Sequence, residues 1–177
     1  FMLMSFILGA FVSGLVLLPG SLLNCILAPV IGKMYDKYGP RAVITPGTVL
    51  VVIGYALYAT YDVNTPLWAM VVTHIVWMLG VGMVLASTQT NTLNSLPREY
   101  YPDGIALTQT VQQVAGAIGI AVMVSLLSAR QASELATGVA LPDATASGST
   151  LVFIVGLILA VINFILSLFM KKPGHIK

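Results

Sequence analysis

The sequence predicts an all-α, polytopic membrane protein with five complete transmembrane helices and the end of a sixth. The first reason is composition, since 58% of the residues are hydrophobic and 8% are charged, whereas a soluble domain carries about 25% charged residues. The second is charge placement, because the charges gather in five short stretches separated by uncharged runs of about 20 to 35 residues. About 20 apolar residues span a bilayer as a helix, and a β-barrel would instead show short alternating segments.

The remaining composition excludes several other classes. Cys25 is the single cysteine, so no internal disulfide is possible. The net charge is +2 without a basic patch, so no nucleic-acid partner is expected. The first apolar run has no basic residues before it and is too long for a secretory signal peptide. Because the chain begins with Phe1 inside that run, we expect it to be a piece of a longer protein.

The N-terminal run is predicted to contain two helices. Phe1–Leu8 is interpreted as the end of a helix, with glycines allowing a turn after it, and the first complete span covers about 10–35. Pro19 and Gly20 lie in the middle of this span. Proline removes one backbone hydrogen bond and clashes with the preceding turn, so we expect a kink there.

Four further spans are predicted at about 42–61, 67–92, 104–129 and 151–170. In the first of these, three tyrosines recur at helical spacing near the far end, where an aromatic belt would lie. The stretch Arg130–Thr150 contains Pro142, Gly148 and many small residues, and we expect it to be a polar loop.

Loop charges predict how the helices are oriented. Five crossings would place the loops at 33–41 and 94–103 and the C-terminal tail on one side of the membrane. Arg130 is the single cation on the other side, whereas this side carries Lys33, Lys37, Arg41, Arg98, Lys171, Lys172 and Lys177. An excess of Lys and Arg marks the cytoplasmic side. We therefore expect a multi-pass protein of the cell membrane with the 33–41 loop and the C-terminus in the cytoplasm.

Glutamines gather on one face of the 104–129 span. Gln109, Gln112, Gln113, Gly116 and Gly119 are spaced three or four residues apart. An amide in hydrocarbon requires a hydrogen-bond partner. Two interpretations stay open at this point: the face packs against another helix that the glycines allow to approach closely, or the face lines a wet cavity.

The 67–92 span contributes two more polar candidates. His74 is the one histidine within a predicted span, and an intramembrane histidine suggests substrate binding or proton movement. The simpler interpretation is a neutral, hydrogen-bonded histidine near the outer interface. Gln89 lies near the cytoplasmic end of the same span, where it would be either solvated or part of a cavity wall.

No catalytic, metal or cofactor site is predicted. No Asp or Glu lies within any predicted span, and the sequence contains no H-E-x-x-H motif, no G-x-S-x-G motif, no phosphate-binding loop and no Cys/His metal spacing. We therefore expect a protein that is not an enzyme.

The charged turn Gly32–Arg41 has the form G-x-x-x-D-[RK]-x-G-x-[RK], and it resembles the signature loop of the major facilitator superfamily. Further matching segments are Leu17-Leu18-Pro19-Gly20, Leu96-Pro97-Arg98 and Gln112-Gln113-Val114-Ala115-Gly116-Ala117-Ile118-Gly119. Over Gly14–Ala121 this ordered set resembles the C-terminal half of the fourteen-helix drug:proton antiporters of the EmrB/QacA type.

The resemblance implies a role for each part. The Phe1–Leu8 helix end and the 67–92 span would line a central cavity, the first and fourth spans would flank it, and the second and fifth would face lipid. Asp36 would face the positive end of a helix in the other half and help to close the cytoplasmic side. A simpler interpretation is that Asp36 caps its own turn. The implied gating residues are Gly32, Asp36, Lys37, Gly39 and Arg41.

The predicted function is transmembrane transport, as a fragment of a multidrug efflux permease that exports lipophilic or cationic compounds by proton antiport. The expected partners are the lipid bilayer, the missing N-terminal half, a drug-like small molecule and protons. The cavity-wall candidates are His74, Gln89, Gln109, Gln112 and Gln113. The alternative is a small oligomeric membrane scaffold or pore with no transport cycle of its own, in which oligomerisation would satisfy the glutamines.

Overall fold

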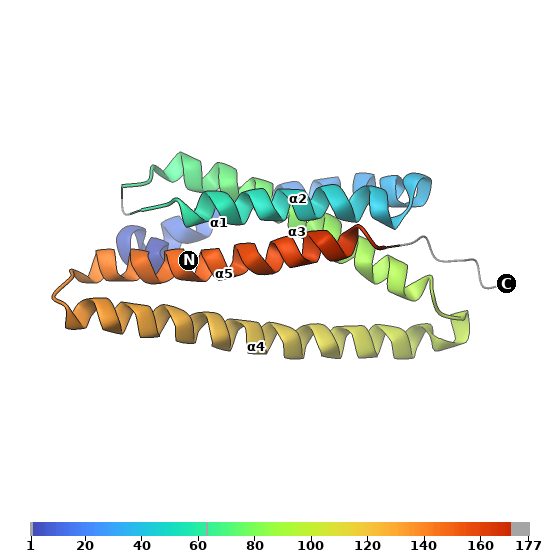
Figure 1. The fold of residues 1–177 in the computed structure, drawn as a ribbon. Coiled ribbons are helices and arrows are strands. Elements are labelled where there is room, and N and C mark those ends of the chain that lie inside the picture. Colours follow the sequence, from blue (N-terminus) through green and yellow to red (C-terminus); the bar gives the residue numbers. More distant parts are fainter. Residues whose placement is uncertain (1, 63, 171–177) are drawn as a thin grey trace.

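Five long helices and one short 3₁₀ helix make up the computed structural model, which describes residues 2–62 and 64–170, with side chains from residue 14 onward (Figure 1). The elements are α1 (Met2–Tyr38), α2 (Pro40–Ala59), α3 (Leu67–Leu93), η1 (Arg98–Tyr100), α4 (Tyr101–Ala136) and α5 (Leu141–Ser167). All five long helices are long and apolar enough to cross a membrane. The predicted all-α class with five spanning helices is therefore confirmed. The cationic tail at 171–177 lies outside the described residues.

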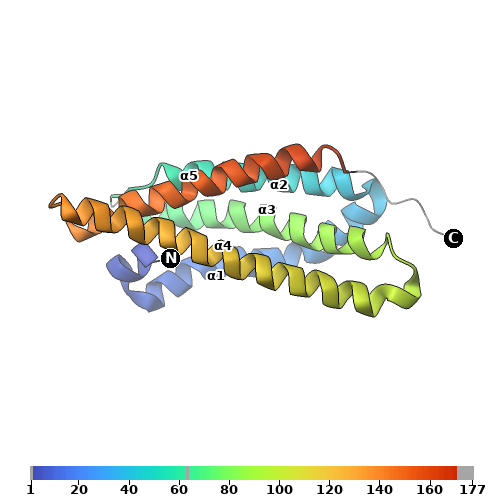
Figure 2. The same ribbon diagram turned by 60° about the horizontal axis from the view of Figure 1, so that its bottom comes forward.

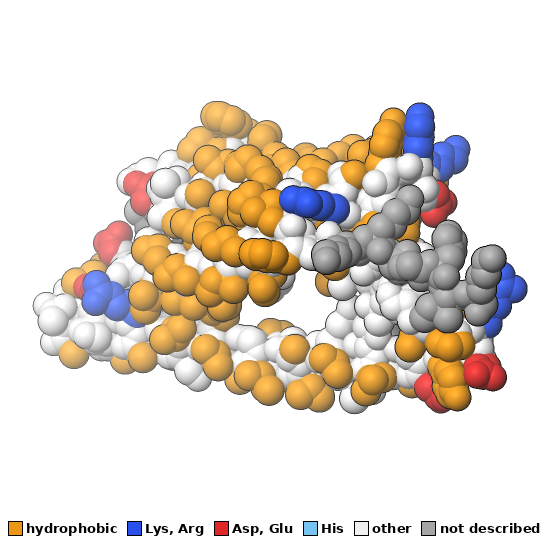
Figure 3. Space-filling model, turned by 45° about the vertical axis from the view of Figure 1, so that its right-hand side comes forward, with side chains coloured by type: hydrophobic (Ala, Val, Ile, Leu, Met, Phe, Trp, Pro, Cys, Tyr) orange, Lys and Arg blue, Asp and Glu red, His pale blue; other side chains and the backbone are white. Residues whose placement is uncertain are grey.

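The long helices run alternately in opposite directions. The α1–α2 turn, the α3–α4 connection and the C-terminal end of α5 lie at one end of the molecule, and the α2–α3 and α4–α5 connections lie at the other (Figures 1 and 2). Neighbouring helices pack in the order α1, α3, α2, α5, α4. In the space-filling view the middle of the visible face is largely hydrophobic and the charged side chains lie mostly toward the two ends (Figure 3). This distribution is the one expected of a protein with a bilayer around its middle.

The closest helix contact joins α2 to α3. A Cβ atom at Gly80 of α3 would lie 2.7 Å from the carbonyl oxygen of Gly47 and 2.8 Å from the backbone nitrogen of Val51. Glycine is therefore required for the two backbones to approach this closely. Small residues are the usual means of close helix packing in lipid, where the hydrophobic effect does not drive helices together.

The predicted loop at Arg130–Thr150 is wrong, because only residues 137–140 separate α4 from α5. Gly138 ends α4 with a φ of 87°, and the N–H of Val139 donates to the carbonyl of Glu134, which is the usual glycine-ended helix stop. Pro142 lies in the first turn of α5, where its missing N–H costs nothing. Gly148 packs against α4, since a Cβ there would lie 2.9 Å from the carbonyl oxygen of Leu127. The proline and glycine that suggested a loop thus serve a helical hairpin.

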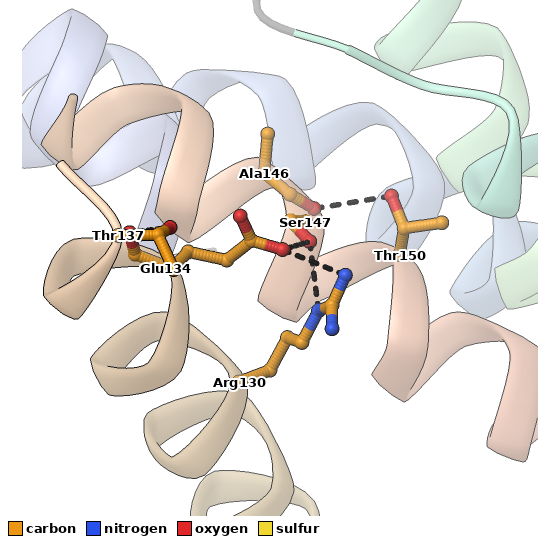
Figure 4. Close-up of polar contacts among 6 residues, drawn as sticks. All are labelled: Arg130, Glu134, Thr137, Ala146, Ser147 and Thr150. Atoms are coloured by element: carbon orange, nitrogen blue, oxygen red, sulfur yellow. Dashed lines mark hydrogen bonds and ion pairs between the residues drawn. The ribbon is translucent and has the colours of Figure 1, made fainter. Parts of the chain in front are cut away.

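Polar side chains hold this hairpin together (Figure 4). Arg130 forms an ion pair with Glu134, with 2.6 Å between Nη2 and Oε1, and its Nε donates to Ser147 Oγ at 3.1 Å. The Ser147 hydroxyl in turn donates to Glu134 Oε1 at 3.3 Å. A second link joins Gln131 Nε2 to Thr145 Oγ1 at 2.7 Å. The C-terminal end of α4 is therefore fixed to α5.

The predicted division of the N-terminal run is also not observed. The helix α1 continues without a break from Met2 to Tyr38, through Pro19 and Pro29. Glycine lowers helix stability by about 1 kcal/mol but does not force a turn. With 37 residues, α1 contains more helical residues than the about 20 that one bilayer core requires.

The tyrosines near the end of α2 face other helices. Tyr58 stacks on Phe153 of α5, with ring centroids 5.0 Å apart. The Tyr55 ring packs so closely on Gly156 of α5 that a Cβ there would lie 2.5 Å from Tyr55 Cε1. The Tyr61 hydroxyl bonds Thr73 Oγ1 of α3 and donates to the Ala69 carbonyl. The helical spacing of the tyrosines thus brings them into helix interfaces as well as to the end of the helix.

A single residue, Gly39, connects α1 to α2. Its φ of 85° and ψ of 176° belong to a backbone region that is essentially restricted to glycine. Its N–H donates to the carbonyl of Tyr35 at 2.8 Å, and Pro40 begins the next helix at once. A glycine just past one helix and a proline at the start of the next explain why the reversal needs no longer loop.

We expect Gly39→Ala to lower the free energy of unfolding by about 1–3 kcal/mol, because alanine is strained in this backbone region. The measurement is the thermal midpoint of the purified protein in detergent, followed by helical circular dichroism. Gly32→Ala is the matched control, since a Cβ at Gly32 in α1 meets no atom within 4 Å. The control should be unchanged or slightly more stable. Equal midpoints for the two variants would contradict a special role for Gly39.

Candidate functional site

The charged turn presents its side chains to the surroundings at one end of the bundle. Asp36, Lys37 and Arg41 are all exposed. The Lys37 ammonium lies 5.1 Å from the centroid of the Tyr38 ring, within the range of a cation–π contact. Gly32 is exposed as well. Among the described residues, the one ion pair is at Arg130, so the charges of this turn are available to a partner outside this part of the chain.

Asp36 lies in the last turn of α1, where a negative charge is unfavourable. The C-terminal end of a helix carries a partial negative charge, so an acidic residue there costs roughly 0.3–1 kcal/mol, whereas Lys37 beside it is favourable. The simpler interpretation, that Asp36 caps its own turn, gains no support, because Gly39 is the N-cap residue after the turn and no side-chain cap bond is formed there. Local helix stability therefore does not account for an aspartate at this position.

A buried cluster anchors the base of the turn. Ile31, Tyr35 and Val43 are each at most 7% exposed and pack together across α1 and α2. Met83 of α3 packs against them, and the Tyr35 hydroxyl donates to Asn91 Oδ1 at 3.3 Å. The turn is thus attached to α3 as well as to its own two helices.

Two of the predicted glutamines come together between α3 and α4. Gln89 and Gln109 line one cavity of about 190 Å³ with Leu93, Ile105 and Thr108. The cavity lies next to the α3–α4 connection, at the same end of the bundle as the charged turn. Two amides and a hydroxyl can offer both donors and acceptors to a polar guest.

The rest of the glutamine face is largely open in the described structure. Gln112 is half-buried and Gln113 is exposed. No atom lies within 4 Å of a Cβ built at Gly116 or Gly119. Packing within this bundle therefore does not explain why glycine occurs at these two positions. That Gly116 and Gly119 allow another helix to approach stays a prediction.

His74 lies apart from the glutamines, among α1, α2 and α3. It is 6% exposed, and its Nδ1 is 3.2 Å from the hydroxyl of Tyr58. Its ring packs against Gly20 of α1, where a Cβ would lie 2.9 Å from His74 Cδ2. Its Nε2 has no hydrogen-bond partner among the described residues. This position favours the interpretation of His74 as a histidine that joins helices.

Gly20 thus has a visible packing role. Pro19 precedes it inside a helix that continues past both residues, so the kink remains a prediction.

Asn24 makes a polar contact between α1 and α3. Asn24 Nδ2 donates to the carbonyl of Met78 at 2.9 Å. The amide lies directly over Gly82, because a Cβ there would be 2.2 Å from Asn24 Oδ1. An asparagine in an apolar run was the visible signal, but its partner is a backbone carbonyl, which no sequence pattern identifies.

Within residues 2–62 and 64–170, no group of three or more His, Cys, Asp or Glu side chains comes together in a way that could hold a metal ion.

Comparison with known proteins gives a family and several relatives. The family model described as Major Facilitator Superfamily matches residues 1–120. The lincomycin resistance protein LmrB of Listeria monocytogenes is 43% identical over 173 residues, which cover 95% of this chain and 37% of that protein. LmrB of Bacillus subtilis is 40% identical over 94% of this chain and 36% of its own length. No solved structure matches the chain.

A third relative, the uncharacterized MFS-type transporter YcnB of Bacillus subtilis, is 34% identical over 93% of this chain and 34% of its own length. The chain therefore spans little more than a third of the length of these curated relatives. The family consists of transporters rather than enzymes, which confirms the expectation that this is not an enzyme. The match over residues 1–120, together with five apolar helices, shows that the chain is a multi-pass membrane protein that belongs to the Major Facilitator Superfamily.

Proposed function

We propose that the chain is the C-terminal bundle of a longer drug-efflux permease, which exports lipophilic or cationic compounds by proton antiport. The relatives carry names such as lincomycin resistance protein and, at 23% identity over 66% of this chain, multidrug efflux pump. Alternating access requires one bundle to move against another around a site near the midplane. The missing N-terminal half would supply the second bundle, and the carboxylates that couple export to protons would lie there.

The observation that carries this proposal is the exposed Asp36 carboxylate in the last turn of α1. A negative charge at this helix end is locally unfavourable, so a partner elsewhere is the simplest reason for it. The N-terminus of a helix in the other half, with its free N–H groups and partial positive charge, would be such a partner. Lys37 and Arg41 would pair with acidic groups or lipid head groups beside it, and Gly32 and Gly39 would shape the turn.

The proposed substrate wall is the polar face of α4. Gln112 and Gln113 continue the face on which Gln109 meets Gln89 of α3, and amides bind neutral and cationic guests alike through their oxygen and nitrogen atoms. We propose that His74 joins α3 to α1 and α2 and so supports this wall indirectly.

A second candidate function rests on the same exposed face. The glutamines and the open positions at Gly116 and Gly119 would also be covered if copies of the chain associated through α4, as a membrane scaffold or pore. A cross-linking experiment distinguishes the two functions.

In the intact permease, Asp36→Asn should slow export of a fluorescent cationic dye from inverted vesicles by roughly tenfold or more. One charge-assisted hydrogen bond contributes about 1.5–3 kcal/mol, and 1.4 kcal/mol corresponds to a factor of ten. The level of protein in the membrane should be unchanged.

Glu99→Gln is the matched control for that variant, because it removes one exposed carboxylate at the same end of the bundle. It should export at the rate of the unaltered protein. Export at that same rate by Asp36→Asn would refute the proposed latch.

We propose that the end of the bundle with the charged turn lies in the cytoplasm. Ser95→Cys lies at that end and Asn64→Cys at the opposite end, and both positions are exposed. With Cys25 replaced by alanine, a membrane-impermeant thiol reagent added to intact cells should label only the cysteine at 64. Labelling of the cysteine at 95 alone would reverse the orientation.

A cysteine at position 116 separates the two candidate functions. In the permease, Gly116→Cys should cross-link to another segment of the same protein, because the other half would cover the α4 face. In native membranes we expect little formation of a chain-to-chain dimer. Efficient self-cross-linking, with no larger partner in the membrane, would favour the oligomeric scaffold.

A further inference from the structure

The C-terminal end of α3 lies between the two parts of the candidate site. Gln89 and Leu93 are four residues apart, so they share one face of α3, and both line the cavity that faces α4. Asn91 lies midway between them in the sequence. At about 100° per residue it is turned by about 200° from each of them, which puts it on the opposite face of the helix. One face of this helix end thus meets the cavity, and the other is free to meet α1.

Tyr35 of α1 contacts that opposite face. Its hydroxyl donates to Asn91 Oδ1 at 3.3 Å, and the residue is 7% exposed. Its ring is held in the buried cluster with Ile31 and Val43, and Met83 packs against this cluster. Because the ring is enclosed on several sides, the hydroxyl cannot follow Asn91 by rotating freely, so a shift of α3 at this point acts on α1.

The other polar side chains at this end of α3 bond within their own stretch of chain. The hydroxyls of Thr90, Thr92 and Ser95 each donate to the carbonyl four residues earlier. In the part of the chain that the structure describes, the Tyr35 hydroxyl is the one hydrogen-bond partner that residues 84–95 have in another helix. The polar link between the cavity wall and the rest of the bundle therefore runs through this tyrosine.

The same tyrosine also holds the charged turn. Its carbonyl accepts the N–H of Gly39 at 2.8 Å, which is the bond that closes the reversal between α1 and α2. Asp36 is the next residue along the chain and is exposed. Tyr35 thus joins three parts of the molecule: α3 through its hydroxyl, the turn through its carbonyl, and the proposed latch carboxylate through its peptide bond.

The size of the Gln89–Gln109 cavity gives a reason for α3 to move. The cavity measures about 190 Å³, whereas pockets that enclose a drug-sized ligand measure about 300–1,000 Å³. A ligand of that size has to separate α3 from α4 in order to enter. Packed helices respond to such a ligand by shifting as units rather than by deforming locally. The share of the movement that α3 takes up reaches Asn91 and its partner.

From these observations we propose that the Tyr35–Asn91 hydrogen bond couples the cavity to the latch. A ligand between α3 and α4 shifts the end of α3, and Tyr35 passes this shift to the backbone beside Asp36. Tyr35 is a positioning residue, because it touches neither the cavity nor the partner proposed for Asp36. This inference rests on the proposed transport function and adds to it the link between an occupied cavity and the charged turn.

The first test measures export of ethidium, a fluorescent cationic dye, by the intact permease in inverted membrane vesicles over a range of dye concentrations. Tyr35→Phe keeps the buried ring and removes only the hydroxyl, so the fold should be retained. The maximal rate should fall about fivefold, the effect of one hydrogen bond. The half-saturating dye concentration should not change comparably, because the cavity wall is untouched.

Tyr61→Phe is the matched control for that variant. It also removes a hydroxyl that bonds α3, through Thr73 and the Ala69 carbonyl, but at the opposite end of the bundle. It should export at the rate of the unaltered protein. An unchanged maximal rate in Tyr35→Phe, or an equal loss in Tyr61→Phe, would overturn the proposal.

Asp36→Asn, measured in the same vesicles, separates this inference from the proposed function. Slow export by Asp36→Asn together with unaltered export by Tyr35→Phe would keep the latch and refute the coupling. Unaltered export by Asp36→Asn would refute the latch itself, and the coupling would fall with it.

A double variant tests whether Tyr35 acts through Asn91. Adding Asn91→Leu to Tyr35→Phe should slow export no further, because both changes remove the same bond. A second loss of about fivefold in the double variant would mean that the two side chains act separately, and the proposed contact would not be the coupling element.

A binding measurement tests the coupling without transport. Coupled sites change each other's affinity reciprocally, so Asp36→Asn should alter the dissociation constant of ethidium for the purified permease by about fivefold or more. In the Tyr35→Phe background the same substitution should leave the dissociation constant unchanged. An equal change in both backgrounds, or no change in either, would contradict a coupling that runs through Tyr35.

Discussion

In a bilayer every backbone N–H and C=O group needs a partner within the protein, and the structure of this chain depends on that constraint. Helices satisfy the backbone, so the polar side chains decide what else is bonded. The hydroxyls of Ser21, Thr90, Thr108 and Ser125 each donate to the carbonyl four residues earlier in their own helix. They can therefore lie on an apolar helix without needing a neighbour.

Amide and imidazole side chains do not find hydrogen-bond partners within their own helix turn in this way. They therefore mark positions where another helix or a ligand is in contact. Asn24 reaches across to a carbonyl of α3, and His74 meets Tyr58 of α2. Gln89 and Gln109 face a shared cavity, and Asn163 faces another. The functional hypotheses for this chain thus follow from which polar groups find partners inside the bundle and which are left for something outside it.

The bundle is unevenly packed, and the unevenness fits a part of a larger transporter. The close approach of Gly47 and Gly80 makes α2 and α3 a rigid pair, to which α1 is bonded through Tyr35 and Asn24. In contrast, α4 is held chiefly by its hairpin with α5 and presents an open face. Relatives of nearly three times this length have further chain that can cover such a face.

The sequence by itself determined the membrane class, the number of spanning helices and the position of the charged turn. Charges are costly in hydrocarbon, so the gaps between charged stretches locate the helices. The reversal at the single residue Gly39, inside the predicted 33–41 loop, was shown only by the structure. The family resemblance seen in the turn and in the glutamine segment also came from the sequence. The sequence did not show which residue each side chain contacts.

Only the tertiary structure decided those partners. Pro142 and Gly148 suit either a loop or a helical hairpin, and the contact of Gly148 with α4 selects the hairpin. Tyr58 suits either an interface belt or a helix contact, and His74 and Phe153 select the contact. His74 was grouped with the glutamines by chemistry, but the packing of α1, α2 and α3 separates it from them. Periodicity fixes which residues share a face, and only the approach of another helix determines what that face touches.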